Sequence, residues 1–225
     1  MPAGGGTVRV RFDPALIPEN PNLEFEQPLW ARGLRCVAGL DEAGRGALAG
    51  PVFAAALVLP AEPERITAAL AGARDSKQLC AEAREELAQR IRAASAAWGL
   101  GWAEADEIDR LGIACASRAA FCRALDALAL TPEHLLIDYF RLPEKTLPQT
   151  ALVKGDQRSL SIACASILAK TARDARMRAE EARFPGYGFA RNKGYGTEAH
   201  RRAIAKMGEC ALHRRSFRLR DESLF

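Results

Sequence analysis

Three short apolar runs in this sequence each end in carboxylates. Asp41 and Glu42 follow CVAGL, Asp138 follows HLLI, and Asp156 follows TALVKG. A single acid at a strand end commonly only caps a turn, but strand ends in an open α/β sheet gather around one crevice, so we expect these acids to converge. Clustered carboxylates raise one another's pKa unless a cation neutralises them, and hard divalent ions prefer oxygen ligands. The pattern therefore predicts a divalent-metal site that could activate water for attack on phosphorus.

The turn after the first acid pair is glycine-rich and reads AGRGALAG. Gly44 and Gly46 permit a positive φ or a close backbone approach, and Arg45 offers a guanidinium fork to phosphate oxygens. The turn is not a P-loop, because no Lys-Ser/Thr follows at the required spacing, and it lacks the G-x-G-x-x-G spacing of a dinucleotide fingerprint. It favours a contact with phosphate or sugar.

Strands alternating with amphipathic helices are expected to position these residues. Apolar runs bounded by turns predict strands over residues 36–41, 51–60, 97–105 and 134–140 and an edge strand over 150–156. Periodicity predicts helices over residues 79–94, 116–130, 159–183 and 197–208. Thr197 is expected as the N-cap of the last helix and Gly208 as its end. The third helix is apolar all round in its first half, SLSIACASILAK, so we expect that half to be buried, while Asp174 further along is expected to form a salt bridge with Arg173, Arg178 or Lys170. The element order predicts an α/β fold.

Composition excludes several classes of protein. The chain has 225 residues, 48% of them hydrophobic, which is enough for a folded core. The longest apolar stretch, residues 47–61, is broken by glycine and prolines and is shorter than the ~20 residues that span a bilayer. The N-terminus has no apolar signal segment, so we expect a cytoplasmic protein. Six scattered cysteines without a CxxC pair are expected to be small buried hydrophobes, and no zinc site is expected.

The two ends of the chain differ from its middle. The first 34 residues are rich in proline and glycine and show no sustained period, so we expect an extended arm without a core. Between Arg183 and Arg220, ten Arg or Lys residues accompany only Glu198 and Glu209. This positive excess indicates a polyanionic partner, although a solvated helix face would have the same composition.

Six blocks of this sequence together resemble bacterial ribonuclease HII. They occur in family order between Val37 and Phe217 and read VAGLDEAGRG, LAGPV, DSKQL, LLIDYF, VKGDQRSLSIACASILAKTARD and YGFARNKGYGTEAH. The resemblance implies a ribonuclease H-like mixed sheet flanked by helices, with an arm at 1–34, a catalytic domain at 35–183 and a helical basic segment at 184–225 that contacts nucleic acid. It also implies that Mg²⁺ or Mn²⁺ is held by four catalytic carboxylates, namely Asp41, Glu42, Asp138 and Asp156.

The resemblance further implies which residues contact the substrate, namely Gly44, Arg45, Gly46, Ser76, Lys77 and Tyr195. The turn from Gly44 to Gly46 would read the 2′-hydroxyl that only RNA has. Tyr195 would pack on the sugar beyond the scissile phosphate, and Ser76 with Lys77 would contact the backbone, although Ser76 could instead cap a helix. The sequence departs from the family pattern at Ala47, where proline is frequent, and at Asn192, where histidine is frequent. These departures put only fine substrate contacts in doubt.

The implied activity is metal-dependent hydrolysis of the RNA strand in RNA/DNA hybrids and incision 5′ to ribonucleotides in duplex DNA. The products would carry 3′-hydroxyl and 5′-phosphate ends, and the roles would lie in DNA replication and ribonucleotide excision repair. Two alternatives are a non-catalytic nucleic-acid-binding protein and a transposase- or integrase-like nuclease of the same fold. The acids argue against the first, and the glycine turn together with Tyr195 argues against the second. We expect a monomer, with at most a weak contact to a sliding clamp through Leu224 and Phe225.

Overall fold

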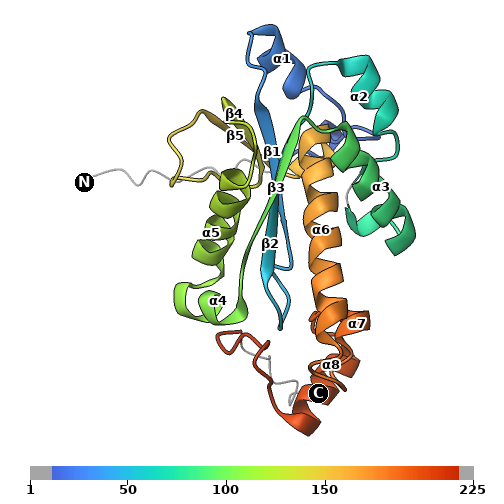
Figure 1. Cartoon of the computed structure of the whole chain (residues 1–225), viewed down its shortest axis with the longest axis vertical. Coiled ribbons are helices and arrows are strands. Elements are labelled where there is room, and N and C mark those ends of the chain that lie inside the picture. The colour runs from blue at the N-terminus through green and yellow to red at the C-terminus, as the bar shows by residue number, and fades with distance from the viewer. Residues whose placement is uncertain (1–11, 75, 218–225) are drawn as a thin grey trace, which may run out of the picture.

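A mixed sheet forms the centre of the computed structural model, which describes residues 12–74 and 76–217 (Figure 1). The strand order is β3-β2-β1-β4-β5. The strands are β1 Val37–Ala43, β2 Val52–Val58, β3 Ala97–Ala103, β4 His134–Asp138 and β5 Gln149–Leu152. β1 pairs antiparallel with β2 and parallel with β4, and β4 pairs parallel with β5. The carboxyl ends of β1, β4 and β5 therefore lie at the same edge. The five predicted strands are confirmed, but the edge strand ends at Leu152, and residues 155–157, predicted to lie at its end, form a 3-10 turn instead.

Helices cover both faces of this sheet (Figure 1). α3 (Ala81–Ala94) and α6 (Leu160–Glu180) lie on one face, and α5 (Ile113–Asp126), preceded by α4 (Ala105–Leu111), lies on the other. The first ten residues of α6, 160–169, are all buried, as their apolar sequence predicts. Gly39 of β1 allows α6 to lie this close, because a Cβ at that position would be 2.5 Å from Ser161.

The N-terminal segment is not the coreless arm expected from its composition. It contains the helix α1 (Glu26–Ala31), and Leu23, Leu29 and Trp30 are buried in the core shared with α6. The fully buried Glu26 accepts hydrogen bonds from Ser159 Oγ at 2.6 Å and from Ser161 N at 2.9 Å. The expectation was wrong because a six-residue helix is too short to show a period, and its burial depends on a partner at the start of α6.

The C-terminal part has a small core of its own at one end of the molecule (Figure 1). Its helices are α7 (Phe189–Asn192) and α8 (Glu198–Met207). Thr197 caps α8 by accepting a hydrogen bond from His200 N, and Gly208 ends it at φ +79°, so both predicted helix ends are confirmed. The remaining short elements are α2 Pro63–Ala69 and 3-10 turns at Pro14–Leu16, Ser76–Gln78 and Gly155–Gln157.

The cysteines are more accessible than expected. Cys164 is buried in α6, whereas Cys80 and Cys115 are exposed and the other three are partly buried. The expectation of buried thiols is therefore wrong for most of them, because an Ala-rich helix such as α5 also has a face toward solvent. Among residues 12–74 and 76–217, no helix combines the length and the apolar character needed to cross a membrane.

Candidate active site

The four carboxylates predicted to converge all lie at the edge where the parallel strands end. Asp41 and Glu42 belong to the last part of β1, and Asp138 is the last residue of β4. Asp156 lies in the 3-10 turn that follows β5, three residues before the N-cap of α6. The parallel pairing of β1, β4 and β5 is what brings them together. Asp41 and Asp156 are buried, with 5% and 6% of their surface exposed.

Asp41 is held in a position that disfavours its charge. Burial is the largest cause that raises its pKa well above the ordinary value, followed by the charges of Glu42, Asp138 and Asp156. A hydrogen bond with Ser166 on α6 opposes this rise. Asp41 Oδ1 also accepts a hydrogen bond from the amide of Glu42 at 2.7 Å. A buried acid surrounded by like charges is the arrangement that a cation would stabilise.

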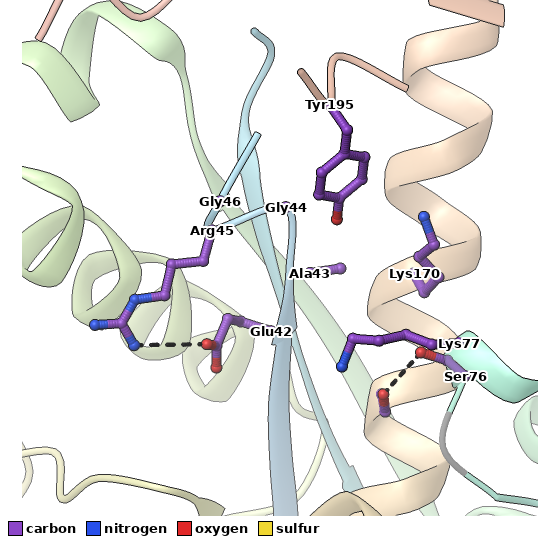
Figure 2. Close-up of a pocket in the computed structure, with 10 residues that line it drawn as sticks. Glu42, Ala43, Gly44, Arg45, Gly46, Ser76, Lys77, Lys170 and Tyr195 are labelled. Carbon is purple, nitrogen blue, oxygen red and sulfur yellow. Dashed lines mark hydrogen bonds and ion pairs between the residues drawn. The ribbon is translucent and has the colours of Figure 1, made fainter. Parts of the chain in front are cut away.

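The pKa of Glu42 is raised for the same reasons as that of Asp41. Burial, and then the charge of Asp138, raises the pKa of Glu42 to about 7. Arg45 offsets part of this effect, with its guanidinium 3.7 Å from Glu42 Oε1 (Figure 2). The other oxygen, Oε2, is buried and has no hydrogen-bond donor within the described residues. A buried acceptor without a donor beside other carboxylates suits an oxygen-binding cation.

The remaining two acids have partners that orient them. Asp138 Oδ1 accepts a hydrogen bond from Gly155 N at 2.7 Å, and Lys77 Nζ lies 3.9 Å from Asp156 Oδ2. The donor set is charged and consists of oxygens only, which fits Mg²⁺ or Mn²⁺ and does not fit zinc. In the part of the chain that the structure describes, no three acidic, cysteine or histidine side chains are already arranged around one ion position. The fit to a metal ion therefore depends on the negative charge of the four acids and on Glu42 Oε2, the buried oxygen without a hydrogen-bond donor.

A pocket of about 480 Å³ lies beside these acids. Its lining residues are Glu42, Ala43, Gly44, Arg45, Gly46, Ser76, Lys77, Ser166, Lys170 and Tyr195. Figure 2 shows the Tyr195 ring entering from the C-terminal loop, with its hydroxyl directed toward the end of β1. Lys170 approaches from α6, and the Lys77 amine points toward the strand. All the predicted substrate contacts thus line one pocket.

Cations hold the Tyr195 ring in this pocket. Lys170 Nζ lies 5.2 Å and Arg173 Cζ 5.1 Å from the ring centroid, which is within the range of cation–π attraction. Asn192 orders the preceding turn, because its Oδ1 accepts from Gly194 N and its Nδ2 donates to Tyr187 O, both at 2.7 Å. The departure from the family pattern at position 192 therefore has a structural role in this chain.

Ser76 does not cap a helix with its side chain. Its buried hydroxyl is 3.0 Å from Ser166 Oγ on α6, an interaction that Figure 2 marks with a dashed line. Ser166 in turn lowers the pKa of Asp41, so Ser76 lies next to a residue that acts on the acid cluster. The main chain of Ser76 is held by Arg84, which donates to its carbonyl at 3.0 Å. Lys77, in contrast, is 76% exposed and can reach a ligand directly.

Asp174 belongs to a separate ion pair. It is buried, with Lys170 Nζ at 2.7 Å and Arg84 at 3.0 Å from its oxygens. The predicted salt bridge is confirmed for Lys170, whereas Arg84 was missed. No sequence signal could identify Arg84, because it lies on a different helix, 90 residues away.

One arginine of the basic C-terminal segment, Arg214, is buried and is not available to bind nucleic acid. Arg214 is 1% exposed and donates to main-chain carbonyls of the turn after β1. Its inclusion among nucleic-acid-facing arginines was wrong, because the guanidinium is used inside the protein. Arg201, Arg202 and Arg215 remain exposed. Arg218 and Arg220 lie outside the described residues.

Known proteins that are similar to this chain in sequence or in structure agree with this architecture. The family described as Ribonuclease HII matches residues 38–220. Ribonuclease HII of Moorella thermoacetica is 54% identical over 194 residues, which cover 86% of this chain and 92% of that protein. Among solved structures, the PCNA:RNase HII complex from Archaeoglobus fulgidus has a TM-score of 0.68 at 26% identity, covering 84% of this chain and 98% of that chain. Bst-RNase HIII in complex with Mn²⁺ has a TM-score of 0.63 at 25% identity, and the match covers 85% of this chain and 70% of that chain. With this sheet and these matches, the chain belongs to the ribonuclease HII family and is a ribonuclease H, a nuclease that hydrolyses RNA paired with DNA.

Proposed function

We propose that this enzyme cleaves the RNA strand of RNA/DNA hybrids and incises duplex DNA 5′ to embedded ribonucleotides, leaving 3′-hydroxyl and 5′-phosphate ends. The observation that supports this most is the shared location of the acid cluster, the glycine turn and Tyr195. The first supplies charge for hydrolysis, and the other two contact the sugar on either side of the reacting phosphate. Such an enzyme would serve DNA replication and ribonucleotide excision repair.

The four carboxylates Asp41, Glu42, Asp138 and Asp156 are the proposed catalytic and metal-binding residues. When bound there, Mg²⁺ or Mn²⁺ would activate a water molecule and stabilise the leaving oxygen. The chain itself orients two of these acids in spite of their repulsion, through the hydrogen bonds from Gly155 N to Asp138 and from Glu42 N to Asp41. Because these bonds are already made, the two carboxylates need little reorganisation on metal binding.

Cationic side chains around the pocket are proposed to hold the substrate. Lys77 is exposed and lies near Asp156, so its ammonium can contact the phosphate backbone next to the acid cluster. Arg45, 39% exposed, can do the same from the opposite side of β1. Ser76 fixes the main chain next to Lys77, because its hydroxyl is hydrogen-bonded to Ser166 on α6. Tyr195, fixed by Lys170 and Arg173, supplies a flat surface for a deoxyribose.

Cleavage of three duplexes would test this proposal. The substrates are DNA with one ribonucleotide, a full RNA/DNA hybrid and all-DNA, each with EDTA, Mg²⁺ or Mn²⁺. We expect incision of the first two only with metal, and a single 5′-phosphate product terminus at the ribonucleotide. Failure to cut the single-ribonucleotide duplex while the hybrid is cut would refute the embedded-ribonucleotide activity.

Substitution of Tyr195 tests its proposed position. Tyr195→Ala should reduce the rate on the single-ribonucleotide duplex by about ten- to a hundredfold and affect binding less, because the ring aligns the sugar beside the reacting bond. Tyr195→Phe is the matched control and should retain most activity, since the ring and its two cation contacts remain. Unaltered rates for Tyr195→Ala would remove this residue from the site.

We also propose a weak contact between the end of the chain and a sliding clamp. Leu224 and Phe225 lie outside the described residues. The support comes from their resemblance to clamp-docking peptides with two apolar anchors and from the archaeal neighbour solved as a PCNA:RNase HII complex. Titration with the cognate clamp should detect binding by the wild-type protein and no binding by the Leu224→Ala/Phe225→Ala variant. No binding by wild type would refute this contact.

A further inference from the structure

A buried arginine from near the end of the described chain builds the turn that follows β1. Arg214 donates from Nη2 to Gly44 O at 2.8 Å, from Nη1 to Arg45 O at 2.9 Å and from Nε to Gly50 O at 2.9 Å. Its side chain lies over the Phe217 ring, 5.0 Å from the centroid. Burial lowers the pKa of Arg214 to about 9, so the guanidinium remains charged at neutral pH and keeps its donors.

These bonds fix two peptide units that line the active-site pocket. The described chain contains no cis peptide bond, so each amide N–H points opposite to the carbonyl that precedes it. With the carbonyls of Gly44 and Arg45 turned toward Arg214, the N–H groups of Arg45 and Gly46 must point away from it. Within the described residues neither of these N–H groups donates a hydrogen bond. Two unpaired donors are thus held side by side at the wall of the pocket.

Further contacts hold the turn in this conformation. Gly44 has φ +88°, and a Cβ there would lie 1.8 Å from the Arg173 side chain, so only glycine is accommodated. Further along, Leu48 N and Ala49 N both donate to Gly194 O, which ties the loop to the segment that carries Tyr195. Arg173 donates to the carbonyls of Ala49 and Pro51. Among the described residues, Arg214 and not Arg173 donates hydrogen bonds to the carbonyls of Gly44 and Arg45.

We propose that Arg214 is a positioning residue for ribose selectivity. It holds the amide N–H groups of Arg45 and Gly46 ready to donate to the 2′-oxygen of a ribonucleotide, which a deoxyribose lacks. This inference rests on the proposed function, in which the Gly44–Gly46 turn reads that hydroxyl. Preorganised donors strengthen such recognition, because binding then requires no ordering of the turn.

Binding without metal separates this role from general stabilisation of the fold. Fluorescence anisotropy would compare duplex DNA containing one ribonucleotide with the same duplex made only of deoxyribonucleotides. Wild type should prefer the first duplex. Arg214→Gln should reduce this preference by about fivefold or more, because the two donors lose their fixed direction, while affinity for the all-deoxy duplex changes less than about twofold. Arg214→Lys, which keeps the charge without the planar fork, should be intermediate.

Arg215→Gln is the matched control, because the neighbouring side chain is exposed and the Arg215 amide donates to Asp109 on the surface. It should weaken both duplexes alike and leave the preference unchanged. Arg214 variants that keep the wild-type preference would overturn the inference. If wild type cuts the ribonucleotide-containing duplex but binds both duplexes equally, the inference fails and the proposed function stands. If wild type does not cut that duplex, the proposed function itself fails.

Hydrogen exchange provides a second measurement that needs no variant, in case Arg214 variants do not fold. In free wild-type protein the amides of Arg45 and Gly46 should exchange rapidly, since they have no acceptor. The ribonucleotide-containing duplex should protect them at least about fivefold more than the all-deoxy duplex. Equal protection by the two duplexes, or slow exchange in the free protein, would overturn the inference.

Discussion

Replacing Glu42 by glutamine should stabilise the metal-free protein at alkaline pH while it abolishes metal-dependent cleavage. In the folded protein the pKa of Glu42 is raised from 4.5 to about 7, chiefly by burial and by Asp138. Between these pH values the folded state binds a proton that the unfolded chain has released, so stability falls as pH rises through this window. At pH 8 the cost is about 3 kcal/mol, and at pH 5 it is less than about 1 kcal/mol. Glutamine keeps the shape of the side chain and removes this cost.

Thermal unfolding in EDTA at pH 8 and pH 5 measures the difference. For a chain of this size about 3 kcal/mol corresponds to a rise in Tm of roughly 6–12 °C at pH 8, and the rise should nearly vanish at pH 5. Added Mg²⁺ should raise the Tm of wild type more than that of the variant, because Glu42 is a proposed ligand. Glu64→Gln, at an exposed position, should show no such pH dependence. A Glu42→Gln protein that melts below wild type at pH 8 in EDTA would refute the electrostatic reasoning.

Three further outcomes are expected. Asp138→Asn should lower cleavage at least a hundredfold and leave hybrid affinity within a few-fold by anisotropy, because it removes one proposed ligand charge; near-normal cleavage would contradict the site. Asp174→Asn should lower the free energy of unfolding, measured in urea, by about 3 kcal/mol, because Arg84 would lose a buried partner. If the unfolding midpoint is unchanged and cleavage is lost as in Asp138→Asn, Asp174 on α6 is itself a catalytic acid. Burial lowers the pKa of His200 and of His213, so the unfolded chain binds more protons and stability should decline as pH falls below about 6.5; His213→Gln should flatten this decline in melts between pH 7 and pH 5.

The sequence alone determined the features that depend on neighbours along the chain. β1 and β4 were predictable as apolar runs that end in acids, and the buried half of α6 as an apolar run long enough for a helix. Thr197 and Gly208 marked the ends of α8, because capping depends on local backbone donors and on a positive φ. The convergence of the acids also followed from the pattern, since parallel strands ending in carboxylates place them at one edge of the sheet.

Tertiary structure alone decided which charged groups are buried. Glu26 and Arg214 belong to segments whose composition indicated an exposed arm and a basic surface, yet both are inside the protein. A charge can be buried only where hydrogen-bond partners compensate for lost water, and these partners are distant in sequence: Ser161 lies 135 residues from Glu26, and Arg45 lies 169 residues from Arg214. Periodicity and composition describe residues near one another in the chain, so they contain no information about such partners. The turn beside the acids is therefore recognisable in the sequence, while the arginine that fixes its conformation became visible only in the folded chain.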